Sequence, residues 1–311
     1  MKKHILCRIC LAFLCVLLCC PLQAMAVNLN EACSLTLHYK EQDRGLEGLE
    51  IHLYRVGEVF ADGKYALVQP YEDYPVDIQG EMPVEEWKNI AATLQAYISA
   101  DRLKPDFTKI TDEEGTVEFA GLKTGLYLVS GVTCETETST CLFDDFLMFL
   151  PRQNGEKLEY HVEAQPKFSQ YVTKEETTEY SVRKLWKDEG SKNKRPVSVS
   201  VDILKNGEVQ KNVELSADNY WYYSWSAPVG DRWSVVERQV PEGYTVTVSG
   251  DEMTFVITNT YKTEEPGDPG KVPTGDTAPI LLYILLTCLS GFCLVILGIA
   301  VLRGKQHDKK R

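Results

Sequence analysis

Three residues with complementary chemistry stand at corresponding positions of three predicted strands in the C-terminal half of the sequence: Lys184, Glu237 and Asn259. Every second side chain of a β-strand lies on the same face of its sheet. Each of the three therefore shares a face with apolar neighbours. These neighbours are Tyr180, Val182 and Trp186, then Trp233 and Val235, then Phe255, Ile257 and Tyr261. An amine, a carboxyl group and a carboxamide are thus predicted to point into one interior.

Burying a charged amine and a carboxylate is costly unless the two are paired. Desolvation lowers the pKa of a lysine and raises that of a glutamic acid. The neutral amine of Lys184 can then attack the side-chain carbonyl of Asn259, while protonated Glu237 polarises that carbonyl and relays protons. Ammonia leaves, and an isopeptide bond remains. The alternative is an ordinary ion pair between Lys184 and Glu237 with Asn259 uninvolved, and strand parity alone leaves both interpretations open.

The segment that carries these residues, 180–262, is predicted to be a small antiparallel sandwich. Apolar and polar residues alternate over 197–203, which indicates a half-buried strand. Asn206 and Gly207 follow, and both residue types tolerate the positive φ of a tight hairpin turn. Aromatic residues alternate next, at Trp221, Tyr223 and Trp225, and we expect them to belong to the core.

The preceding segment, 27–168, is also predicted to form strands, because apolar residues alternate at 35–39 and 117–119. One helix interrupts them. Its apolar face repeats at helical spacing, at Trp87, Ala91, Leu94 and Ile98. Pro83 stands near its start, where proline is tolerated, and Pro105 lies past its end. The polar stretch 169–179 is predicted to link two domains. The predicted fold class is all-β, with two sandwiches in tandem and a helix inserted in the first.

The second segment resembles the Cna protein B-type domain, which builds stalks and pilus subunits of Gram-positive surface proteins. The sequence segments that carry this resemblance are Val-Arg-Lys184-Leu-Trp, Trp-Ser-Val-Val-Glu237-Arg-Gln-Val-Pro-Glu-Gly-Tyr and Phe-Val-Ile-Thr-Asn259-Thr-Tyr. The resemblance implies an Ig-like sandwich with a self-formed Lys–Asn isopeptide bond, assisted by an acidic residue. All three functional positions match, so the resemblance favours the isopeptide bond over the plain ion pair.

The first segment resembles the N-terminal domain of pilin-type surface proteins through Gly48-Leu-Glu-Ile-His-Leu-Tyr-Arg-Val and Thr111-Asp-Glu-Glu-Gly-Thr-Val-Glu-Phe. It departs from the bonded pattern, since Gly131 stands where the acid would be and Lys40 has outward parity. No isopeptide bond is expected there. Its end, Gln-Pro-Lys167, keeps part of the Tyr-Pro-Lys-Asn motif that links pilin subunits. Lys167 is therefore either a pilin-type lysine or an exposed interdomain lysine.

The two ends of the chain predict export and anchoring. Residues 1–26 read as a signal peptide cleaved after Ala26. Residues 263–277 form a Pro/Gly linker, 278–302 an uncharged predicted transmembrane helix, and 303–311 a basic cytoplasmic tail. The linker contains Val272, Pro273, Thr274 and Gly275, which resemble a degenerate sortase sorting signal. Two interpretations stay open: sortase joins Thr274 to peptidoglycan, or the helix remains a membrane anchor. The expected location is the cell surface, as a single-pass membrane protein with its N-terminus outside.

Composition limits the partners and cofactors. The formal net charge of −12 argues against nucleic acid as a partner. Outside the two predicted hydrophobic ends only Cys33, Cys134 and Cys141 remain, and the last two are either a disulfide or two free thiols. No metal, cofactor or enzymatic turnover is expected, because histidines and nucleophiles show no suitable spacing.

Together these features predict a non-enzymatic structural or adhesion protein, which is a pilin-like subunit or an adhesin stalk. Its partners would be the membrane, sortase and peptidoglycan, and other pilin subunits or an environmental ligand. The alternative is a single-span membrane receptor or carbohydrate-binding module displayed on β-sandwich domains.

Overall fold

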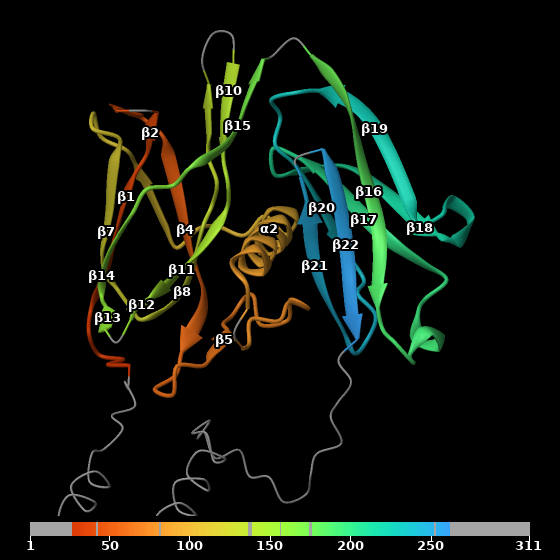
Figure 1. Ribbon diagram of the computed structural model, residues 1–311, viewed down its shortest axis with the longest axis horizontal. Helices are drawn as coiled ribbons and strands as arrows, with labels where there is room; N and C mark the ends of the chain where they lie inside the picture. The colour runs from red at the N-terminus through yellow and green to blue at the C-terminus, as the bar shows by residue number, and fades with distance from the viewer. Residues whose placement is uncertain are drawn as a thin grey trace, which may run out of the picture. The chain divides into compact units, whose positions relative to one another are not determined.

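The computed structural model describes residues 27–261 apart from positions 42, 81, 136–138, 156, 174–175 and 252. The described chain is mostly β-structure (Figure 1). We call residues 33–164 the first sandwich and residues 177–261 the second sandwich. The predicted signal peptide with its cleavage site after Ala26, the sorting-type sequence 272–275, the predicted membrane span at 278–302 and the basic tail lie outside the described residues.

Two sheets build the first sandwich. One contains β14 (His161–Ala164), β1 (Cys33–His38) and β7 (Thr116–Leu122), with β1 parallel to β14 and antiparallel to β7. The other orders β11 (Phe146–Leu150), β8 (Gly125–Val129), β4 (Glu50–Val59) and β5 (Tyr65–Leu67), and β6 (Phe107–Ile110) pairs with β4. Along β1 the buried Leu35 and Leu37 alternate with half-buried residues, as predicted, and they join the core between the two sheets.

Shorter strands complete this part of the chain. The paired strands are β2 (Lys40–Glu41) with β3 (Arg44–Gly45) and β12 (Arg152–Asn154) with β13 (Lys157–Glu159). A further sheet orders β15 (Phe168–Thr173), β10 (Ser139–Phe143) and β9 (Thr133–Glu135). The stretch 169–179, predicted as a linker from its polar composition, contains strand residues at both of its ends. Its first half pairs with β10 as β15, and its end already belongs to the second sandwich.

Helix α2 (Val84–Ala100) begins directly after Pro83, as predicted, and has two buried faces. Leu94 and Ile98 pack with residues of β4 and β8 of the first sandwich. Ala96 and Tyr97 instead belong to the core of the second sandwich. The helix therefore lies between the two sandwiches (Figure 1), and it contributes apolar side chains to both.

The second sandwich packs a four-stranded sheet on a three-stranded one. The first sheet orders β19 (Tyr222–Pro228), β16 (Thr177–Lys187), β22 (Thr254–Tyr261) and β21 (Tyr244–Gly250). The second orders β18 (Glu208–Ser216), β17 (Ser198–Lys205) and β20 (Trp233–Glu237), and two 3-10 turns lie at Lys192–Lys194 and Ala217–Asn219. Strands β16 and β22 are parallel neighbours. The predicted turn at Asn206 and Gly207 is confirmed, with φ values of 50° and 82°.

The expected location as a single-pass membrane protein is corrected by the structure. Within the residues that it describes, no helix is both long and apolar enough to cross a bilayer. The described helix α2 has 17 residues, whereas a span needs about 20 predominantly apolar ones.

Candidate functional site

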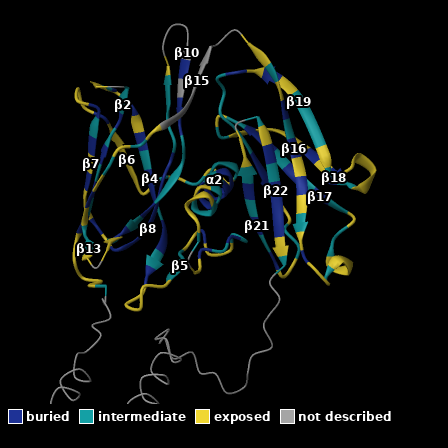
Figure 2. Ribbon diagram, in the orientation of Figure 1, coloured by how far each residue is buried: buried dark blue, intermediate teal, exposed yellow. Residues whose placement is uncertain are grey.

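Lys184 is the first of the three chemically notable residues, and it is buried on β16. Along this strand inward residues alternate with exposed ones (Figure 2), and Lys184 shares the inward face with Val182. Its side chain is 0% exposed. The Nζ atom donates to the backbone carbonyls of Leu185 at 3.0 Å and Ile257 at 3.4 Å, and it lies 4.2 Å from the ring centroid of Trp186. An aromatic face and two carbonyls thus surround the amine in place of water.

Glu237 reaches the same point from the opposite sheet. It is the last residue of β20, and its side chain is also 0% exposed. Its Oε2 lies 3.5 Å from Nζ of Lys184, and its Oε1 accepts a hydrogen bond of 2.8 Å from Nδ2 of Asn259. One carboxyl group therefore bridges the amine and the amide, each of which comes from the facing sheet.

Asn259 occupies β22 and is completely buried. The parallel register pairs Lys184 with Ile257 and Trp186 with Asn259, so the lysine and the asparagine share one face of neighbouring strands. Among the described residues, Oδ1 of Asn259 has no hydrogen-bond partner. A buried carbonyl oxygen without a donor costs about 1–3 kcal/mol. An ionised Glu237 cannot satisfy it, whereas a protonated one could donate to it after the amide turns by half a revolution.

Burial shifts both members of the pair toward their uncharged forms. Burial lowers the pKa of Lys184 from 10.5 to about 8, against the opposing influence of the Glu237 charge. Burial likewise raises the pKa of Glu237, opposed by Lys184 and by the hydrogen bond from Asn259. The neutral pair carries the same number of protons as the ion pair, so one proton transfer between the two side chains reaches it.

Asn259→Ala leaves the amine and the acid in place, and its unfolding free energy is expected to rise with pH between about 8 and 10.5. Within this window the unfolded chain binds more protons at Lys184 than the folded chain, so stability increases with pH. The gain in unfolding free energy from deprotonating Lys184 is complete above the pKa of this lysine in the unfolded chain, where it amounts to roughly 3 kcal/mol. The gain is lost as the pH falls through the pKa of Lys184 in the folded chain. Denaturant midpoints across this range would measure it.

The matched control is Lys184→Met in the same Asn259→Ala background, which keeps every other titrating group. The difference between the two chains isolates the lysine. If both chains show parallel pH profiles, Lys184 does not titrate with a lowered pKa.

The other residues singled out from the sequence lie away from this cluster. Cys134 and Cys141 are directly opposite each other on β9 and β10, and their pairing stays a prediction. Cys33 is buried in the first core, where burial raises the pKa of its thiol to about 11. Lys167 is exposed between β14 and β15. Gly131 donates its backbone N–H to Oδ1 of Asp145 at 2.6 Å.

Sequence reasoning missed a second polar cluster at the edge of the site. Asp188 is buried just past the end of β16 and accepts hydrogen bonds from Arg195 at 2.7 Å and from Tyr244 at 2.9 Å. Tyr244 packs edge-on against Trp186, with 5.4 Å between ring centroids. The cluster thus holds the tryptophan that covers Lys184. Its signal was only an acid directly after a strand, which usually indicates a turn.

The fold and the site together define the class of domain: an Ig-like sandwich with a buried amine–acid–amide cluster between its sheets. Residues 180–260 match the model of the Cna protein B-type domain, which confirms the resemblance expected for this segment. The curated collagen adhesin of Staphylococcus aureus is 29% identical over 141 residues, covering 40% of this chain and 12% of that protein. The match thus spans about an eighth of that relative's length.

Solved structures with similarity to this chain include pilins and adhesin repeats. The full-length major pilin SpaD from Corynebacterium diphtheriae has 15% identity, covers 76% of this chain and 66% of that one, and has a TM-score of 0.30. The T6 backbone pilin of Streptococcus pyogenes has 11% identity, 76% and 65% coverage and a TM-score of 0.32. A single B repeat unit of the S. aureus collagen-binding protein has 14% identity, 75% and 99% coverage and a TM-score of 0.26.

Proposed function

We propose that this chain is a non-enzymatic structural protein of the cell surface, a pilin-like subunit or an adhesin stalk, whose second sandwich locks itself with an isopeptide bond. Nζ of Lys184 bonds to Cγ of Asn259, and the bond from Cγ to Nδ2 breaks. Glu237 takes a proton from the attacking amine and gives a proton to the departing nitrogen, which leaves as ammonia. The reaction happens once per chain and needs no cofactor.

The observation that carries this proposal is that one buried carboxyl group, that of Glu237, lies against both the amine of Lys184 and the amide of Asn259. The carboxyl group of Glu237 lies 3.5 Å from the amine and 2.8 Å from the amide nitrogen, with no exposed surface on the lysine or glutamate side chain. Strands β16 and β22 are the first and last of the second sandwich, so the bond would link the two strands at which the chain enters and leaves this sandwich. A collagen partner is not carried over from the curated relative, because the match covers a small part of that protein.

The wider assignment rests on the sequence match of residues 180–260 to a domain of surface stalks and pili. We also propose that the chain is exported through residues 1–26. Lys167 is exposed after β14, and it is the residue that a pilin-type link between subunits would use. Sortase and peptidoglycan would be partners only if residues 272–275 serve as a sorting signal.

Peptide mapping of the purified full-length chain is expected to find a branched tryptic peptide. The isopeptide bond blocks cleavage after Lys184, so residues 184–187 stay attached to residues 239–262. The mass should equal that of the two peptides minus one ammonia, roughly 17 Da. Without the bond, trypsin cuts after Lys184 and the two peptides separate. Finding the separated peptides alone in the wild-type chain would end the proposal.

A further inference from the structure

The first sandwich covers the open side of the second one. Strand β20 is the edge of the three-stranded sheet and β21 is the edge of the four-stranded sheet. Edge strands leave one row of backbone N–H and C=O groups unpaired. Helix α2 lies against both β20 and β21 (Figure 1). The two sheets of the second sandwich are thus bridged at this side by an element of the first.

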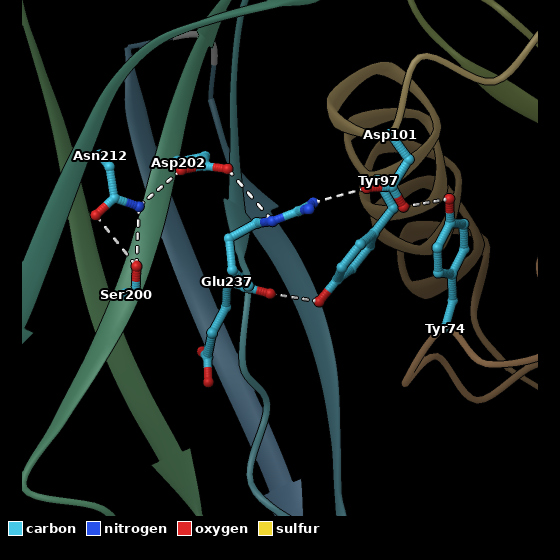
Figure 3. Close-up of polar contacts among 8 residues, drawn as sticks. Tyr74, Tyr97, Asp101, Ser200, Asp202, Asn212 and Glu237 are labelled. Atoms are coloured by element: carbon cyan, nitrogen blue, oxygen red, sulfur yellow. Dashed lines mark hydrogen bonds and ion pairs between the residues drawn. The ribbon is translucent and has the colours of Figure 1, made fainter.

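The bridging contacts are specific hydrogen bonds to edge-strand backbone. The hydroxyl of Tyr97 donates to the backbone carbonyl of Glu237 at 2.7 Å (Figure 3). The backbone N–H of Val248 on β21 donates to Oγ1 of Thr93 at 2.8 Å. The N–H of Val246 donates to the carbonyl of Pro75, in the segment between β5 and the helix, at 2.7 Å. Each of these backbone groups would otherwise be buried without a partner or exposed to water.

Side-chain contacts fix the helix in this place. The ring of Tyr97 stacks on Tyr74 with 4.8 Å between centroids, and the hydroxyl of Tyr74 donates to Asp101 at 2.9 Å (Figure 3). Asp101 in turn lies 2.9 Å from Arg238, the residue after Glu237. Arg238 also lies 3.4 Å from Asp202 on β17. The chain around Glu237 is therefore held from the helix side as well as from its own sheet.

We propose that helix α2 is a positioning element for the isopeptide bond, and that Tyr97 is the positioning residue that holds Glu237 against Lys184 and Asn259. This inference rests on the proposed function. Glu237 ends its strand and pairs with Val201 on β17, so its sheet anchors it from that side. Tyr97 supplies the anchor on the other side. Displacing a catalytic group by about 1 Å can slow a reaction on the order of 10²-fold.

The inference also orders the maturation of the chain. Lys184 and Asn259 lie on paired strands of one sheet, so pairing of these strands is enough to place both side chains on the same face. The acid comes from the other sheet and reaches its position when the helix of the first sandwich docks. Bond formation in the second sandwich therefore follows folding of the first sandwich. The isopeptide bond forms only after the two sandwiches have docked.

The test is the rate of bond formation in the full-length chain made by cell-free synthesis. Samples are quenched over time, and the branched tryptic peptide is measured in the protease-resistant, folded fraction. Tyr97→Phe keeps the ring and removes the hydroxyl, and a roughly 10-fold slower rate is expected from the loss of one buried hydrogen bond. Tyr127→Phe is the matched control, because its hydroxyl donates to the backbone carbonyl of Lys123 within the first sandwich at 2.8 Å. Its rate should equal that of the wild type.

A purely structural role for Tyr97 would reduce the folded fraction and leave the rate within that fraction unchanged. The pH profile gives a second readout. The charge of Lys184 lowers the pKa of Glu237, so moving the carboxyl group away from Lys184 raises that pKa. The fall in the rate of bond formation at low pH should therefore begin at a higher pH in Tyr97→Phe and not in Tyr127→Phe. If Tyr97→Phe does not fold, Arg238→Gln loosens the same docking from the surface and should slow the reaction several-fold.

The outcomes separate the two proposals. If the wild-type chain never forms the branched peptide, the proposed function fails. If the wild type forms it and Tyr97→Phe, or Arg238→Gln in its place, forms it at the same rate and with the same pH profile, the positioning role alone is overturned.

Discussion

Asn259→Ala is expected to lower the unfolding free energy of the second sandwich by about 4–5 kcal/mol relative to the bonded protein. A bond between positions 184 and 259 would close a loop of roughly 75 residues, and a link across a loop of that length removes this much chain entropy from the unfolded state. Four of the five tryptophans, Trp186, Trp221, Trp225 and Trp233, belong to the second sandwich. Tryptophan fluorescence during denaturant unfolding of the full-length chain would therefore report this loss.

A suitable control is Asn212→Ala on the surface of the same sandwich. Asn212 donates hydrogen bonds to Asp202 at 2.7 Å and Ser200 at 2.8 Å (Figure 3). Losing them should cost about 1 kcal/mol. Equal losses in the two variants would mean that Asn259 contributes only local contacts, and that no covalent link stabilises the wild type.

Glu237→Gln should slow isopeptide formation by about 10²–10⁴-fold, while the sandwich keeps its shape. Glutamine fills the same space and can still contact Asn259. It has no ionisable proton, so it cannot take the proton of the amine or return one to the leaving nitrogen. The time course of the branched tryptic peptide after cell-free synthesis measures the effect.

Glu214→Gln on β18 gives the matched control. Glu214 is exposed, and β17 separates its strand from β20, which carries Glu237. It should leave the rate unchanged. A Glu237→Gln chain that links as fast as the wild type would remove the acid from the mechanism, and the buried lysine and asparagine alone would have to account for the bond.

The inward direction of the three site residues was predictable because it depends on a local rule. Strand periodicity is two, so apolar neighbours such as Val182 and Ile257 fix the face of Lys184 and Asn259 without any knowledge of the partner strands. Lys184, Glu237 and Asn259 are all buried, as the sequence predicts. The same rule placed Leu35 and Leu37 in the first core.

The contact between Tyr97 and Glu237 was not predictable, because it depends on how two distant segments pack. Helical periodicity identified one apolar stripe, which contains Leu94 and Ile98 and faces the first sandwich. Ala96 and Tyr97 lie beside that stripe and read as its flank. Only the docked second sandwich makes them a second buried face. A helix between two sandwiches has two stripes, and the second has no signature of its own in a short sequence.

Backbone conformation separates Trp221 from the aromatic residues that follow it. Tyr223 and Trp225 lie on β19, which begins at Tyr222, directly after Trp221. Tyr220 and Trp221 both have a φ of 57°, which is uncommon for bulky residues. The backbone N–H of Lys184 donates to the carbonyl of Trp221 at 2.9 Å. Long-range pairing thus holds Trp221 in a conformation that its residue type does not suggest.

In both sandwiches the strand that enters and the strand that leaves run parallel and side by side, β1 beside β14 and β16 beside β22. A stretched chain would strain such a pair in shear, with several hydrogen bonds sharing the force. In the first sandwich these hydrogen bonds would yield, whereas in the second the proposed covalent bond would hold. The molecule would then act as a tether with one extensible section and one of fixed length. Under a sudden load the first sandwich would unfold and lengthen, while the second sandwich stays folded.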